Sequence, residues 1–173
     1  MDKALITPFE EVVKAFNYLI SPEGSRLSPP QLRGEIERFM ERPGRYRFIV
    51  GADSHPHQGE TVYVCALVVH RVGNGGIFFY WKRKVPRKDS MEERIFNEAI
   101  YSMRMADFVR TRLFPQGLPE SVEQMEVHLD VGSAGRTRGY VSSLVGMVSS
   151  LGLKAVVKPY AFAATKVADR YSK

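Results

Sequence analysis

Three consecutive segments with the composition of β-strands constrain the fold of this chain most. They span Tyr46–Asp53, Thr61–Val72 and Ile77–Val85, and each is rich in β-branched and aromatic residues. Turn-forming residues separate the segments at His55–Gly59 and Gly73–Gly76. Because connections this short join antiparallel neighbours, the sequence predicts a three-stranded antiparallel meander.

The chain after the meander alternates between helical and strand-like segments. A helical pattern begins at Ser90 and runs to about Leu113, and a strand follows at Met125–Asp130. A helix, a strand and a last helix then follow at Tyr140–Leu151, Leu153–Lys158 and Ala161–Tyr171. The predicted order from residue 46 is β-β-β-α-β-α-β-α, an α/β fold with a mixed five-stranded sheet flanked by helices.

Two helices are predicted before the first strand. Apolar residues recur at three- and four-residue steps from Phe9 to Leu19, and that pattern ends by Pro22. Ser28 is a helix start, since two prolines follow it, and Pro43-Gly44 ends this second helix. With 173 residues and 44% hydrophobic content, we expect one domain over residues 1–173. Residues 1–44 would be an N-terminal helical cap and residues 45–173 the core.

Charge and cysteine content narrow the class of protein. The formal charge of +6 and the pI near 9.5 favour an acidic partner, and nucleic acid is the first candidate. The single cysteine, Cys65, excludes an intrachain disulfide and is expected to be a buried apolar thiol. No run reaches the ~18 apolar residues of a membrane span, and the first residues lack the apolar core of a signal peptide. We therefore expect a soluble cytoplasmic protein without a membrane partner.

Four carboxylates lie where predicted strands and helices end. Asp53 and Asp130 each close a strand, whereas Glu98 and Asp169 lie on two separate helices. Acids that converge only in the folded chain are the ligands that hard divalent cations require. Each acid taken alone could instead cap a turn or face water, so the metal-site hypothesis depends on the whole set.

The acidic residue of the central helix has two competitors. Ser90 and Glu93 form a capping box, which gives Glu93 a structural role as acceptor for the N-cap amide. On a helical wheel, Glu92 lies near the centre of the apolar arc and Glu98 lies at its edge. The wheel therefore favours Glu92 over Glu98.

A histidine pair offers a different metal site. His55 and His57 could bind zinc or manganese in another class of hydrolase, although no third histidine follows at ligand spacing. A polar β-turn around Pro56 is the alternative. His128, beside Asp130 in sequence, is a candidate for orienting a ligand or acting as a general acid, or is a hydrogen-bonded buried histidine.

Two groups of basic residues are candidates for contacting phosphates. Arg136 and Arg138 follow Asp130 in a glycine-rich turn and are the better candidates for substrate binding. A basic run beside two aromatic residues could grip a strand of nucleic acid or simply protect a solvated sheet edge. This run consists of Tyr80, Trp81, Lys82, Arg83, Lys84, Arg87 and Lys88.

Three stretches together resemble one family, the ribonuclease-H-like YkuK proteins. They are Ile49–Ser54, Val127–Asp130, and the C-terminal stretch from Lys158-Pro159 to Arg170. The resemblance implies that Asp53, Glu98, Asp130 and Asp169 are catalytic residues that hold two Mg²⁺ or Mn²⁺ ions about 3.5–4 Å apart and hydrolyse a phosphodiester. It also favours Glu98 as the helical acid, since the family has an acid about one turn into this helix.

The resemblance leaves two classes of function open. The first is a metal-dependent nuclease acting on nucleic acid, and the second is a non-catalytic nucleic-acid-binding or scaffold module with the same fold. The residues do not distinguish RNA from DNA or exonuclease from endonuclease activity, and they do not fix the oligomeric state.

Overall fold

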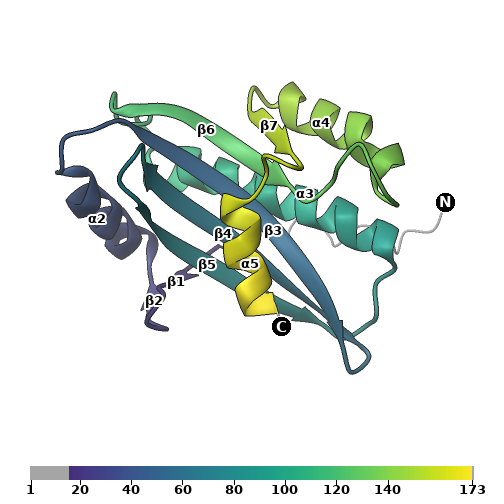
Figure 1. The fold of residues 1–173 in the computed structure, drawn as a ribbon. Coiled ribbons are helices and arrows are strands. Elements are labelled where there is room, and N and C mark those ends of the chain that lie inside the picture. The colour runs from purple at the N-terminus through teal and green to yellow at the C-terminus, as the bar shows by residue number, and fades with distance from the viewer. Residues whose placement is uncertain (1–15, 173) are drawn as a thin grey trace.

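A seven-stranded mixed sheet organises the computed structural model, which describes residues 16–172 (Figure 1). The strand order across the sheet is β2-β1-β5-β4-β3-β6-β7. The strands are β1 (Leu19–Ile20), β2 (Arg26–Leu27), β3 (Tyr46–His57), β4 (Glu60–Arg71), β5 (Gly76–Val85), β6 (Val122–Leu129) and β7 (Lys154–Val157).

The predicted antiparallel meander and the mixed character of the sheet are confirmed. β3, β4 and β5 pair antiparallel in sequence order, β6 pairs parallel with β3, and β7 pairs parallel with β6. The predicted turn at His55–Gly59 is too long, because β3 continues as strand through Pro56 to His57. Only Gln58 and Gly59 form the turn, and both have positive φ, which suits a two-residue hairpin loop.

The five-strand prediction is wrong by two short strands at the sheet edge. β1 pairs with β5 through Ile20 and Tyr80, and β2 pairs with β1. Two-residue strands carry no alternating pattern that a sequence could show, so only the pairing partner makes them strands. Leu19, expected to end the first helix, is therefore a strand residue; the rest of that helix lies almost wholly outside the described residues.

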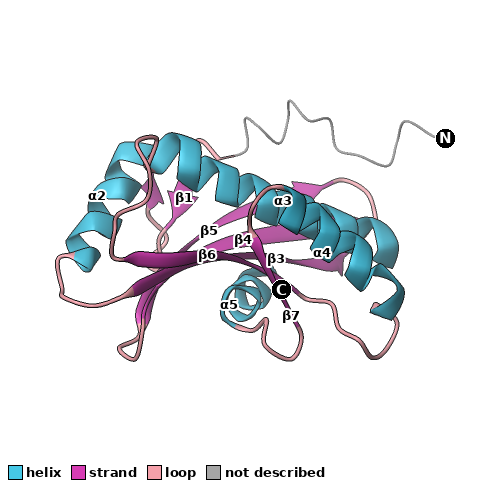
Figure 2. Ribbon diagram, turned by 90° about the horizontal axis from the view of Figure 1, so that it is seen from above, coloured by secondary structure: helices cyan, strands magenta, loops and turns pink. Residues whose placement is uncertain are grey.

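Helices cover the two faces of the sheet unequally. The helices are α2 (Pro29–Met40), α3 (Met91–Phe108) with its π-helical extension η1 (Val109–Leu113), the 3₁₀ turn η2 (Arg138–Tyr140), α4 (Val141–Ser150) and α5 (Ala163–Ser172). Figure 2 shows α2, α3 and α4 on one side of the sheet and α5 alone on the other. The larger core lies under the three helices and includes Leu32, Cys65 and Leu144. Cys65 is thus the buried thiol that was expected.

Gly51 lets α5 pack directly on β3. A Cβ atom at this position would lie 2.9 Å from the Cβ of Ala164 and 3.1 Å from the carbonyl oxygen of His128. Ala164 and Ala168 keep the helix close, together with Ile49 and Val64 of the sheet. The absent side chain of Gly51 therefore sets the position of α5, which carries Asp169.

No helix among residues 16–172 is long and apolar enough to cross a membrane.

Candidate functional site

Two of the predicted site residues lie just beyond the last register pair of two neighbouring parallel strands. Asp53 does not close its strand as predicted, because β3 continues to His57 through its pairing with β4. Gly51 of β3 pairs with His128 of β6, so Asp53 and Asp130 each lie two residues beyond the same register pair. Parallel strands that lie side by side present their carboxyl ends at one edge of the sheet, where α/β proteins commonly place ligands. The strand adjacency required for a joint site of Asp53 and Asp130 is therefore present.

Asp53 lies among acidic residues under the end of α5. Its carboxylate accepts a hydrogen bond from the hydroxyl of Ser172 at 2.9 Å. Burial raises the pKa of Asp53, and the negative charges of Asp169 and Asp130 raise it further, while the Ser172 hydrogen bond opposes the shift. The raised pKa shows that a negative charge on Asp53 is unfavourable without a nearby positive charge.

Glu98 approaches the same strand from the opposite helical layer. Its carboxylate accepts a hydrogen bond from the hydroxyl of Ser54, the residue after Asp53. Burial raises the pKa of Glu98 to about 8; the charges of Asp53 and Asp130 add to the rise, and Arg94 counteracts it. Glu92 is exposed, contrary to the helical wheel, and it lies in the first turn of α3.

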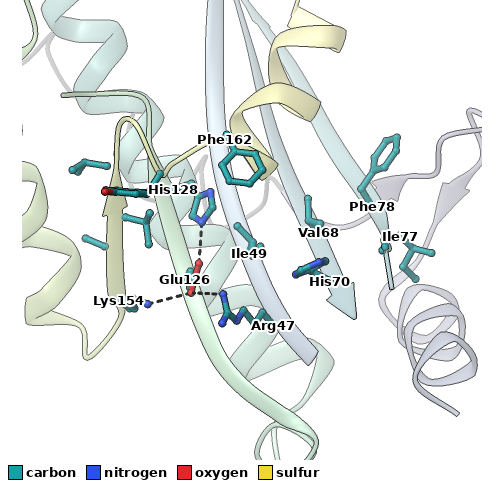
Figure 3. Close-up of a pocket in the computed structure, with 16 residues that line it drawn as sticks. Arg47, Ile49, Val68, His70, Ile77, Phe78, Glu126, His128, Lys154 and Phe162 are labelled. Atoms are coloured by element: carbon teal, nitrogen blue, oxygen red, sulfur yellow. Dashed lines mark hydrogen bonds and ion pairs between the residues drawn. The ribbon is translucent and has the colours of Figure 1, made fainter. Parts of the chain in front are cut away.

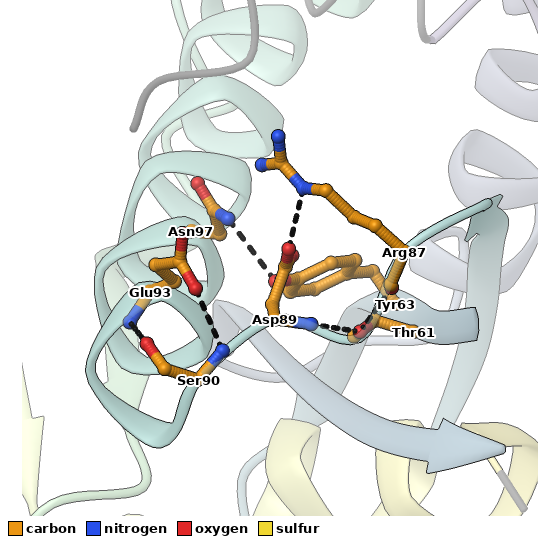
Figure 4. A network of polar contacts seen from close by, with 7 residues as sticks. All are labelled: Thr61, Tyr63, Arg87, Asp89, Ser90, Glu93 and Asn97. Atoms are coloured by element: carbon orange, nitrogen blue, oxygen red, sulfur yellow. Dashed lines mark hydrogen bonds and ion pairs between the residues drawn. The ribbon is translucent and has the colours of Figure 1, made fainter. Parts of the chain in front are cut away.

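A polar network fixes the start of α3 and hence the position of Glu98 (Figure 4). Asp89 is buried, and its carboxylate accepts hydrogen bonds from Tyr63 and Arg87. The predicted capping box is present: the Ser90 amide donates to Glu93 Oε2 at 2.7 Å, and the Glu93 amide donates to Ser90 Oγ at 3.2 Å. Glu93 thus has its expected structural role.

Asp130 has a cationic partner. Its carboxylate lies 2.9 Å from Nζ of Lys158, a residue in the connection between β7 and α5. Gly132 accommodates this connection, because a Cβ there would lie 3.1 Å from Cβ of Lys158. A cation bound by Asp130 would therefore compete with the ammonium group of Lys158.

The basic run is divided between the surface and the core. Trp81 is buried and contacts Phe16, so its ring is not available to stack on a nucleic-acid base. Lys82 and Lys84 are exposed, and Lys82 shares a row of cross-strand neighbours with Val64 and Asp53. Lys82 therefore lies on the face of Asp53, two strands or roughly 10 Å away. Arg136 and Arg138 are exposed in the turn after Asp130.

The four acids are the type of ligand that divalent cations prefer. Their side chains, however, are not arranged around a common point where one cation could bind. Carboxylate oxygens suit Mg²⁺ and Mn²⁺, and the raised pKa values of Asp53 and Glu98 are what a cation would reverse. Within residues 16–172, however, no three His, Cys, Asp or Glu side chains gather closely enough to hold a metal ion. The His55/His57 site gains no third ligand among these residues either, and both histidines are exposed.

Residues 31–173 match the family described as "Ribonuclease H-like". The chain belongs to this family. It is also 28% identical over 149 residues to "Uncharacterized protein YkuK" of Bacillus subtilis (strain 168), covering 80% of this chain and 87% of the relative. The resemblance to ribonuclease-H-like YkuK proteins is thereby confirmed. No solved structure matches the chain.

Several polar residues of this ribonuclease H-like protein could not be selected from its sequence. Ser54 and Ser172 bind the carboxylates of Glu98 and Asp53, but hydroxyl residues are too common to stand out. Glu126 is buried on β6, where His128 Nε2 lies 3.0 Å from its carboxylate. An acidic residue inside the apolar run Met125–Leu129 was the available signal. His128 is therefore the hydrogen-bonded buried histidine, and burial lowers its pKa although Glu126 opposes the shift.

Proposed function

We propose that this protein is a metal-dependent nuclease that hydrolyses phosphodiesters of nucleic acid, with Asp53, Glu98, Asp130 and Asp169 as its metal ligands and catalytic residues. The observation that carries the proposal is the position of Asp53. It lies in β3 two residues beyond the last pair with β6, the strand that Asp130 follows, and the charges of Asp130 and Asp169 both act on it. Membership of the ribonuclease H-like family supports the same chemistry.

The four acids come from the helices on both faces of the sheet and from the sheet between them. Asp169 belongs to α5, Glu98 to α3, and Asp53 to β3. Three of the carboxylates have polar partners: Ser172 and the backbone of Ser54 for Asp53, the Ser54 hydroxyl for Glu98, and Lys158 for Asp130. Hydrogen bonds to charged groups contribute about 1.5–3 kcal/mol and partly exposed ion pairs about 1 kcal/mol or less, so a shared cation has to outweigh these contacts when the carboxylates turn toward it.

Bound Mg²⁺ or Mn²⁺ would supply an activated water and stabilise the leaving oxygen of the phosphodiester. The chain's own cations would position the substrate. Arg136 and Arg138 extend from the turn after Asp130, and Lys82 lies on the face of Asp53, so phosphates could be held on two sides of the acids.

A non-catalytic nucleic-acid-binding module is the second candidate. It is favoured by one observation, namely that no three ligands come together among residues 16–172. In that case Lys158 would be the permanent partner of Asp130, and the basic residues alone would account for binding.

Asp53→Asn separates the two candidates. The amide keeps the shape of the side chain but is a weaker and neutral ligand, so cleavage and Mn²⁺ affinity should collapse while folding survives. Oligonucleotide binding should persist, because phosphate contacts of Lys and Arg do not pass through Asp53. The assay is cleavage of RNA, DNA and hybrid oligonucleotides in Mg²⁺ or Mn²⁺, with Mn²⁺ binding measured by calorimetry.

Asp107→Asn is the matched control, since Asp107 is an exposed acid at the far end of α3. It should leave cleavage and metal affinity unchanged. If the unmodified protein binds these oligonucleotides but cleaves none of them with either metal, the nuclease proposal is wrong and the binding module replaces it.

A further inference from the structure

A groove of about 760 Å³ lies on the half of the sheet that α5 leaves uncovered. Its floor is formed by the part of β3 before Gly51 and by the residues of β4 that pair with that part. Among them are Ile49 of β3 and Val68 of β4. Figure 3 shows Arg47 and Phe162 at opposite ends of this groove, with Glu126 and His128 along one side. A concave site of this size with apolar walls and few polar groups is typical of a small-molecule site.

Exposed aromatic rings mark the groove as a surface that is left open for a ligand. Among residues 16–172 only three large apolar side chains are exposed: Leu151, Tyr160 at 73% and Phe162 at 58%. Two of them, Tyr160 and Phe162, line this groove. Phe78 lines it as well, so a flat ring entering the groove would meet aromatic and aliphatic surfaces.

A buried histidine leaves one hydrogen-bond acceptor unused in the groove. His128 is 3% exposed, and its Nε2 lies 3.0 Å from the carboxylate of Glu126, which can only accept; Nε2 therefore carries the proton. Nδ1 is then an acceptor, and within the described residues this buried atom has no hydrogen-bond partner. A ligand would satisfy it with an N–H or O–H group.

A buried hydrogen-bond donor likewise lacks a partner at the other end of the groove. Nε of Arg47 has no hydrogen-bond partner among the described residues, although its guanidinium lies within 3.9 Å of Glu123 and Glu126. The charged lining comprises two cations, Arg47 and Lys154, against the single carboxylate of Glu126. A ligand would therefore bring a hydrogen-bond acceptor and a negative charge.

We propose that this groove binds a nucleobase together with its sugar-phosphate group. A base supplies a flat ring and an N–H donor on its edge, which answers the unpaired acceptor of His128. The oxygen atoms of the sugar-phosphate group supply the acceptor for Arg47 at the other end of the groove. Stacking on Phe162 or Tyr160 would hold the ring, and the phosphate would lie near Lys154. The source of the base is either a free nucleotide or a strand, and the site does not depend on cleavage by the acids.

The test is calorimetric titration of the full chain with the four 5′-mononucleotides in the presence of a chelator. Ribose 5-phosphate serves as the ligand without a base. At least one mononucleotide should bind, and ribose 5-phosphate should bind at least tenfold more weakly. Val68→Phe, which fills the groove, and Arg47→Met, which removes the guanidinium, should each weaken binding at least tenfold.

Two control variants should leave nucleotide binding unchanged. Arg45→Met removes another partner of Glu123, at 2.8 Å, but Arg45 does not line the groove. Asp53→Asn disables the proposed metal site, so failure of the nuclease proposal and failure of the groove proposal are distinguishable. Arg47→Met tests the groove even if Val68→Phe does not fold.

An oligonucleotide titration identifies the source of the base. If only the oligonucleotide binds, and both groove variants weaken it at least tenfold, the base comes from a strand. If mononucleotides bind and the groove variants weaken them, the source is a free nucleotide. The proposal is overturned if neither ligand responds to the groove variants, or if ribose 5-phosphate binds as well as the mononucleotides.

Discussion

Gly51→Ala should destabilise the protein through a single close contact. The added Cβ would lie 2.9 Å from Cβ of Ala164, and it would also approach the carbonyl oxygen of His128 to 3.1 Å. Both neighbours are poorly placed to give way, since one is backbone and the other belongs to a packed helix. Overpacking of this kind costs about 1–3 kcal/mol, whereas replacing a strand glycine by alanine otherwise gains about 0.5–1 kcal/mol.

The net expectation is a loss of about 1–2 kcal/mol in the free energy of unfolding. For a chain of this length that loss lowers Tm by about 2–8 °C. Urea denaturation followed by circular dichroism measures the loss, and an unchanged m-value would show that the denatured state is unaffected.

A matched control and a compensating substitution isolate the contact. Gly146 lies in α4, and a Cβ there would meet nothing within 4 Å, so Gly146→Ala should stabilise the protein by about 1 kcal/mol. Ala164→Gly removes the opposing methyl group. The double variant Gly51→Ala/Ala164→Gly should therefore lose less stability than the sum of the single variants, by about 1 kcal/mol.

Strict additivity in this cycle, or a Gly51→Ala protein as stable as the unmodified chain, would refute the close packing of α5 on β3. That result would also remove the basis for placing Asp169 near Asp53.

Two further predictions concern charge. In chelator, the stability of the protein should fall as pH rises from near 4.5 to about 8, because Glu98 binds its proton more tightly in the folded than in the unfolded chain. Glu98→Gln should remove most of this slope in denaturation measured across pH; an identical slope would contradict the burial of Glu98. Arg136→Ala should weaken oligonucleotide binding and reduce the slope of log K against log salt by roughly one unit, whereas an unchanged slope would exclude a phosphate contact there.

The order of secondary structure could be predicted from the sequence because each long element carries its own periodicity. β3, β4 and β5 alternate or run as β-branched segments over ten or twelve residues, and Ser90 and Glu93 mark the start of α3 locally. A shared site of Asp53 and Asp130 was expected from their positions in the sequence together with the family resemblance. The two-residue strands β1 and β2 escaped because their only signal is the neighbour with which they pair.

The position of each functional side chain required the tertiary structure. A helical wheel reports which face of α3 is apolar but not where the sheet beneath it ends, so it selected Glu92 although Glu98 reaches Ser54. The partners of the carboxylates, Ser172 and Lys158, are distant in sequence from the acids they contact. The groove beside His128 exists because α5 covers only half of one face, a property of packing between distant segments. Local periodicity therefore determined the elements, and long-range packing decided which side chains they bring together.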